Sequence, residues 1–127
     1  MTDAVADASA VLAILRGEVG AADGLRAISR AAISAVNYAE VISRLVDLGA
    51  SVDDAVQAIG QLDIEVASFD ETGAVRTGAL RQGTRARGLS LGDRACLALA
   101  HRLGLPAVTA DRAWASLDLG VEVVLIR

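Results

Sequence analysis

The sequence has no lysine, and it has only one cysteine, one proline and one histidine. The lone Cys96 excludes an internal disulfide and any zinc site built on several thiolates, and it favours a reducing, cytoplasmic setting. Aromatic residues make up only 2% of the chain, so Ala, Val, Leu and Ile must fill the core. Such small aliphatic side chains favour helices packed closely on a sheet.

The first residues, MTDAVADASA, carry two Asp and no basic residue, which predicts no signal peptide. No uncharged stretch is as long as a membrane span, so we expect no membrane association. A length of 127 residues fits one domain, 1–127. The net charge of −4 is unusual for a nucleic-acid binder, but acids that hold a divalent cation would reverse the local sign.

Strand and helix patterns alternate along the whole chain. Strands are predicted at residues 4–7, 31–34, 64–67, 107–109 and 121–126. Helices are predicted at residues 9–16, which Ser9 could cap, and at 21–27, 34–48, 52–62, 93–103 and 111–117, where Ser51 is the cap of the helix at 52–62. Residues 69–87 also have a helical pattern, but Gly73, Gly78 and Gly83 interrupt it. This alternation indicates an α/β fold with a parallel sheet covered on both faces. Ligands of such folds bind beyond the carboxyl ends of the strands.

Two acids follow buried strands. Asp7 ends the first strand, and Asp111 follows the fourth in the sequence VTAD. Each could simply be a helix cap or a turn residue. Both would nevertheless lie at the same edge of a parallel sheet, which makes them candidate metal ligands.

Two further acids lie on predicted helices. Glu40 precedes Arg44 by four residues, so it could form a surface ion pair with Arg44 instead of binding a metal. Asp93 follows Ser90 by three residues, as in a capping box, and a helix N-terminus would keep its carboxylate ionised. Both acids are candidate ligands if the fold brings them to Asp7 and Asp111.

Four carboxylates cannot gather without a cation, because like charges repel and one group would take up a proton. Mg²⁺ relieves this repulsion and prefers oxygen ligands. Such a site favours metal-assisted phosphodiester hydrolysis, in which one carboxylate that we cannot assign orients or deprotonates the attacking water. The hydroxyls of Ser9 and Thr109 flank the acids and could hold a water, or they could serve as caps and strand-end bonds.

Arginines near these acids are candidate phosphate contacts, because a guanidinium binds phosphate bidentately. They are Arg85 and Arg87, which end a glycine-rich helix, and Arg94 and Arg112, which directly follow two of the acids. A solvated surface is the alternative. Trp114 is predicted to anchor a helix on the sheet rather than to stack on a base.

The segments VADASAVLAIL, SAVNYAEVISRL, LSLGDRACLALA and TADRAW resemble the PIN-domain family, specifically VapC-type toxins of bacterial toxin–antitoxin pairs. The resemblance extends over nearly the whole chain. It implies a three-layer α/β/α sandwich with a five-stranded parallel sheet, and it makes Asp7, Glu40, Asp93 and Asp111 the catalytic and metal-binding acids. It also implies an endoribonuclease that uses Mg²⁺ or Mn²⁺ and leaves 5′-phosphate and 3′-hydroxyl ends. Its partners would be RNA, a cognate antitoxin and a second copy of the chain. Asp118 is a possible fifth acid.

Other phosphate-handling classes lack their residues here. A response-regulator receiver and a haloacid-dehalogenase-type phosphatase both need a lysine, and a P-loop enzyme needs G-x-x-x-x-G-K-[ST]. The remaining alternative is a PIN-like module that binds a protein partner without cutting RNA. Asp7→Asn would leave the function of such a module intact, whereas it would abolish RNA cleavage by a nuclease.

Overall fold

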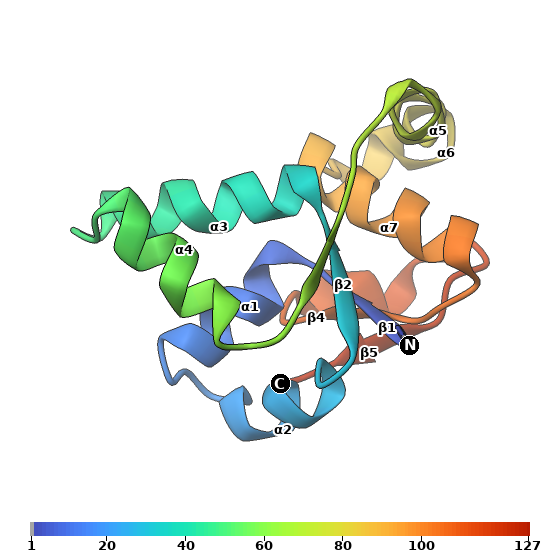
Figure 1. Cartoon of the computed structure of the whole chain (residues 1–127). Coiled ribbons are helices and arrows are strands. Elements are labelled where there is room, and N and C mark those ends of the chain that lie inside the picture. Colours follow the sequence, from blue (N-terminus) through green and yellow to red (C-terminus); the bar gives the residue numbers. More distant parts are fainter. Residues whose placement is uncertain (1) are drawn as a thin grey trace.

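The computed structural model describes residues 2–127, which form five parallel strands with helices on both faces (Figure 1). The sheet order is β3-β2-β1-β4-β5. The strands are β1 (Ala4–Ala6), β2 (Ala31–Ser34), β3 (Glu65–Ala67), β4 (Ala107–Thr109) and β5 (Val123–Leu125). This arrangement confirms the predicted α/β class and its five-stranded parallel sheet.

The helices occupy the connections between the strands. They are α1 (Ala8–Leu15), α2 (Ala21–Ala27), α3 (Ala35–Asp47), α4 (Val52–Gly60), α5 (Glu71–Ala79), α6 (Arg81–Thr84), η1 (Arg85–Arg87), α7 (Leu91–Leu103) and η2 (Arg112–Ser116). Most begin where a polar residue caps the first turn. Ser34 and Ser51 cap α3 and α4, for example, by accepting backbone N–H bonds.

Alternation along β1 divides the core into two layers. Ala4 and Ala6 belong to a cluster that includes the buried residues of α1, α3 and α4. Val5 points the other way, into a cluster with Cys96 of α7 and Trp114 of η2. Both faces of the sheet are therefore covered, and the predicted three-layer α/β/α arrangement is confirmed. Trp114 is 0% exposed, so it is the predicted anchor and cannot stack on a base.

The order of the strands places a switch point between β1 and β4. After β1 the chain builds outward through β2 and β3, and it then returns to the other side of β1 to add β4 and β5. β1 pairs with both neighbours in parallel, with Val5 opposite Ala32 and Ala107. The crossovers on either side of β1 diverge at its carboxyl end, which is where open α/β sheets bind ligands.

Some element boundaries differ from the prediction. The last strand covers Val123–Leu125 rather than residues 121–126. The helix expected over 69–87 is divided into α5, α6 and η1, and the segment ends at Gly88 with φ +64°. Three glycines within that span weaken a continuous helix. The helix expected from Asp93 starts two residues earlier, because Ser90 is its cap.

None of the helices within residues 2–127 is long and apolar enough to cross a membrane.

Candidate active site

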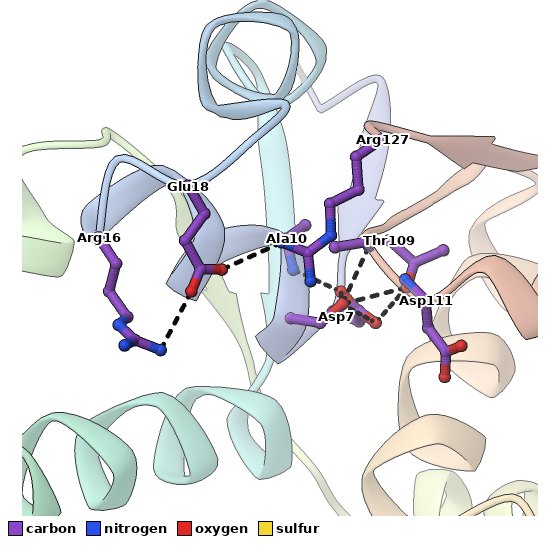
Figure 2. Close-up of polar contacts among 9 residues, drawn as sticks. Asp7, Ala10, Arg16, Glu18, Thr109, Asp111 and Arg127 are labelled. Carbon is purple, nitrogen blue, oxygen red and sulfur yellow. Dashed lines mark hydrogen bonds and ion pairs between the residues drawn. The ribbon is translucent and has the colours of Figure 1, made fainter.

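Asp7 lies directly after β1 and is 4% exposed. Its Oδ1 accepts a hydrogen bond from the Ala10 backbone N–H at 2.8 Å, which makes Asp7 the N-cap of α1. Thr109 Oγ1 donates to its Oδ2 at 2.6 Å (Figure 2). Ser9 Oγ lies 2.8 and 2.9 Å from its two oxygens. Neutral donors alone therefore surround this buried carboxylate.

Burial raises the pKa of Asp7 from 3.8 to about 6. The hydrogen bonds from Thr109, Ala10 and Ser9 oppose this rise, whereas the negative charge of Asp93 adds to it. The ion pairs within residues 2–127 are Arg16–Glu18, Arg26–Asp23 and Arg127–Glu18, and none includes a candidate acid. A buried carboxylate without a positive partner is a place where a bound cation would be stabilised.

Two hydroxyls join the ends of β1 and β4. Ser9 Oγ accepts from the Ala110 backbone N–H at 3.0 Å, and Thr109 Oγ1 accepts from the Asp111 N–H at 3.0 Å. The two hydroxyl oxygens lie 3.2 Å apart. The prediction that Ser9 caps α1 is wrong, because Asp7 occupies the cap and Ser9 lies inside the first turn. Ser9 instead orients Asp7.

Asp111 follows β4 and is exposed. Its Oδ1 accepts a hydrogen bond from the Ala113 backbone N–H at 3.0 Å, so Asp111 caps η2. A helix cap was the alternative that the sequence left open for this residue. In Figure 2 it lies beside Asp7 with its carboxylate directed away from that residue. Its backbone, through Thr109, is nevertheless tied to Asp7.

Asp93 is half-buried in the first turn of α7. It forms the suggested capping box with Ser90, with N–H bonds of 3.0 and 3.1 Å in the two directions. Only Oδ2 takes part, which leaves Oδ1 without a hydrogen-bond partner from the described part of the chain.

Glu40 is exposed on α3, and its suggested ion pair with Arg44 is not among those formed within residues 2–127. Its Oε1 instead accepts from Asn37 Nδ2 at 2.8 Å.

Cys96 is buried on α7, within range of the charges of three of the acids. Burial raises the pKa of its thiol, and the negative charges of Asp7, Asp93 and Glu40 raise it further. Within residues 2–127, however, no three His, Cys, Asp or Glu side chains lie close enough to hold a metal ion as they stand. Three of the four acids, Asp7, Asp93 and Asp111, instead make cap hydrogen bonds at the starts of helices.

The four arginines differ in their contacts. Arg87 donates to the Ala113 and Ser116 carbonyls and so ties η1 to η2. Arg94 is half-buried, and its Nη1 donates to the Thr77 carbonyl at 3.2 Å, which connects α7 to α5. Arg112 and Arg85 are exposed; Arg112 Nε makes only a 3.4 Å bond to the Arg127 carbonyl. Asp118 is also exposed.

Two residues at this edge were missed by the sequence analysis. Asn37 donates to Glu40 and also to the Gly92 carbonyl, at 3.0 Å. Gly92 immediately precedes Asp93 and has the Glu40 carboxylate against its Cα. The available signals were the spacing of three residues between Asn37 and Glu40 and the helix-weakening glycine beside Asp93.

Together, these observations define an α/β protein with a buried carboxylate, Asp7, at the point where the strand order switches. A family model described as the PIN domain matches residues 4–119, and the chain belongs to that family. The predicted family resemblance is thereby confirmed. The comparison with curated proteins found no significant match.

Solved structures share the fold over the whole chain. A chain of a toxin–antitoxin complex from Klebsiella pneumoniae is 24% identical, with a TM-score of 0.78 and 98% of each chain covered. A chain of DNA-bound VapBC from Salmonella typhimurium is 19% identical, with a TM-score of 0.75 and 100% of each chain covered. A chain of VapBC-5 from Mycobacterium tuberculosis, a member of the VapBC family of toxin–antitoxin systems, is 25% identical, with a TM-score of 0.59 and coverage of 100% and 99%.

Proposed function

We propose that residues 1–127 form one PIN-like nuclease domain, a Mg²⁺- or Mn²⁺-dependent endoribonuclease that is the VapC-type toxin of a toxin–antitoxin pair. The proposed metal-binding and catalytic residues are Asp7, Glu40, Asp93 and Asp111. The observation that carries the proposal is Asp7: a carboxylate buried at the strand-order switch, within reach of the Asp93 charge and without a cationic partner.

The donor set fits a hard divalent cation. All four groups are carboxylates, which Mg²⁺ and Mn²⁺ prefer to nitrogen or sulfur ligands. Asp93 Oδ1 has no hydrogen-bond partner among the described residues, and the carboxylates of Glu40 and Asp111 are exposed, so each offers an oxygen atom to a cation. Burial, and to a lesser extent the Asp93 charge, raises the pKa of Asp7, and a bound cation would oppose both effects by stabilising the ionised carboxylate.

Each part of the edge has a distinct task in phosphodiester hydrolysis. Mg²⁺ or Mn²⁺, when bound, supplies the Lewis acidity that activates water and neutralises the phosphate. Thr109 and Ser9 fix the orientation of the Asp7 carboxylate, which is therefore preorganised. One of the four carboxylates orients or deprotonates the attacking water. The products would be 5′-phosphate and 3′-hydroxyl ends.

The proposed RNA contacts are Arg85, Arg87, Arg94 and Arg112. Arg85 and Arg112 are exposed and can reach a phosphate with little rearrangement. Arg87 and Arg94 already bond backbone carbonyls of η2 and α5, so they would also shape the surface on which RNA lies. The side chains supply the positive charge that the overall composition lacks.

The proposed partners are RNA, a cognate antitoxin and a second copy of the chain. Support for an antitoxin comes from the structural neighbours, whose chains were solved in toxin–antitoxin complexes. A cytoplasmic location belongs to the same proposal, because that is where RNA and antitoxin would be met.

The deciding experiment is cleavage of defined RNAs with and without Mn²⁺ by the wild type and by Asp7→Asn. We expect cleavage only by the wild type with metal, because Asn keeps the cap but loses the charge. Asp3→Asn removes an exposed acid outside the site and is the matched control. Full cleavage by a folded Asp7→Asn protein would disprove the assignment. An inactive wild type that still binds an antitoxin would favour the non-catalytic interaction module.

A further inference from the structure

Glu40 is held in place by a neighbour that is itself buried. Asn37 is 1% exposed and lies one turn before Glu40 on α3. Its Nδ2 donates to Glu40 Oε1 at 2.8 Å and to the Gly92 carbonyl of α7 at 3.0 Å. One amide group therefore connects an acid on α3 to the turn of α7 that carries Asp93.

Gly92 supplies the space that the Glu40 carboxylate occupies. A Cβ at this position would lie 2.2 Å from Glu40 Oε1, 2.5 Å from Cδ and 2.6 Å from Oε2. Gly92 lies inside α7 and is not among the residues of positive φ, so its backbone does not require glycine. Glycine also weakens a helix relative to alanine. Neither backbone conformation nor helix propensity therefore accounts for glycine at this position, and what does is the space that a missing side chain leaves for Glu40.

The chemistry of Asn37 is not what packing alone requires. Its Oδ1 is buried and has no hydrogen-bond partner among the described residues, which costs free energy. An aliphatic side chain could join α3 to α7 without that cost. The amide does what an aliphatic group cannot: it binds a carboxylate without neutralising its charge. An arginine in the same place would compete with a metal ion for Glu40.

We propose that Asn37 and Gly92 are positioning residues, which hold the Glu40 carboxylate against the first turn of α7 beside Asp93 and keep it available to a divalent cation. The proposal rests on the proposed function, because it concerns the same acidic edge. Asn37 supplies the directional hydrogen bond, and Gly92 supplies the place into which the carboxylate fits.

The test measures Mn²⁺ binding to the purified chain by titration calorimetry and melting temperature in EDTA, with no RNA present. Gly92→Ala should weaken Mn²⁺ binding at least tenfold, because the new methyl group displaces Glu40. Its melting temperature in EDTA should stay the same or rise, since alanine favours the helix. Gly78→Ala is the matched control, because a Cβ on that helical glycine has no neighbour within 4 Å. It should bind Mn²⁺ as the wild type does.

A double-mutant cycle separates positioning from mere folding. Asn37→Ala should weaken Mn²⁺ binding in the wild type but cause no further loss in Glu40→Gln, because Asn37 acts through Glu40. Wild-type affinity in Gly92→Ala, or equal losses from Asn37→Ala in both backgrounds, would overturn the inference and leave the proposed function standing. A wild type that binds no Mn²⁺ would overturn both.

Discussion

Thr109 Oγ1 donates a 2.6 Å hydrogen bond to Asp7 Oδ2, and this bond joins β4 to β1 across 102 residues of sequence. Both side chains are buried, with exposed fractions of 0% and 4%. The same hydroxyl accepts from the Asp111 N–H, so it orders two of the four acids at once. Removal of the Thr109 hydroxyl should therefore disturb both Asp7, after β1, and Asp111, after β4.

Thr109→Val replaces the hydroxyl by a methyl group of similar size. It removes one of the two hydrogen bonds to the buried Asp7 Oδ2 and leaves the Asp111 N–H without its partner, which should lower the free energy of unfolding by about 1–3 kcal/mol. Thr109→Ser keeps the hydroxyl and should be much closer to the wild type. Urea denaturation at pH 7.5 in EDTA measures both variants. Equal stability of the Val and Ser variants would contradict the assigned bond.

The raised pKa of Asp7 predicts how stability depends on pH. Because the pKa rises from 3.8 to about 6 on folding, the folded chain holds the proton more tightly than the unfolded chain does. The contribution of Asp7 to stability is therefore largest below pH 3.8 and is lost as the pH rises through 6. The difference in pKa corresponds to a loss on the order of 3 kcal/mol.

Asp7→Asn should abolish this component of the pH dependence, because an amide does not titrate in this range. Denaturation in EDTA between about pH 4 and about pH 8 gives the free energy of unfolding of both proteins for comparison. Parallel curves for the two proteins would show that Asp7 is not the group responsible.

Divalent cations should raise the melting temperature, because they bind the folded state and not the unfolded chain. The free energy of unfolding should increase by about 2.7 kcal/mol when the metal concentration is about 100 times Kd. Differential scanning fluorimetry with Mn²⁺ or Mg²⁺ detects it. Asp7→Asn should show little shift, and the exposed Asp3→Asn a full one. An unchanged wild-type Tm at millimolar metal would count against the acidic site.

Trp114 should matter for stability and not for RNA stacking, since its indole is 0% exposed between α7 and the sheet. Trp114→Ala should cost about 3–5 kcal/mol, as is usual for a large buried aromatic residue. Trp114→Phe should cost less than Trp114→Ala, because it leaves a smaller cavity and because the lost Nε1–H has no partner among the described atoms. Circular dichroism follows unfolding in both variants, and RNA affinity of the Phe variant should equal that of the wild type.

Much of the fold could be predicted because its signals are local. The strands at 31–34 and 107–109 were predicted with the bounds that the structure has, and Ser34 and Ser51 were identified as helix starts from neighbouring residues. Glycine interruptions of the helix over 69–87 were predicted, but the places where it divides into α5, α6 and η1 were not. Glycine lowers helix propensity by a moderate amount, and tertiary packing decides whether the chain breaks there.

The site was harder to predict than the sheet. The positions of Asp7 and Asp111 at strand ends could be expected, because each follows a short apolar run in a chain whose strand and helix patterns alternate. The role of Asn37 could not, because it depends on the contact between α3 and α7 and on the direction of one amide group. The orientation of Ser9 toward Asp7, rather than into a cap, likewise depends on where β4 lies.

The switch in strand order also determines when the edge comes into existence during synthesis. Asp7 is synthesised 102 residues before Thr109, its hydrogen-bond donor at the end of β4. Until then β1 has β2 on one side and nothing on the other. The proposed acidic edge can therefore assemble only after most of these residues have been synthesised.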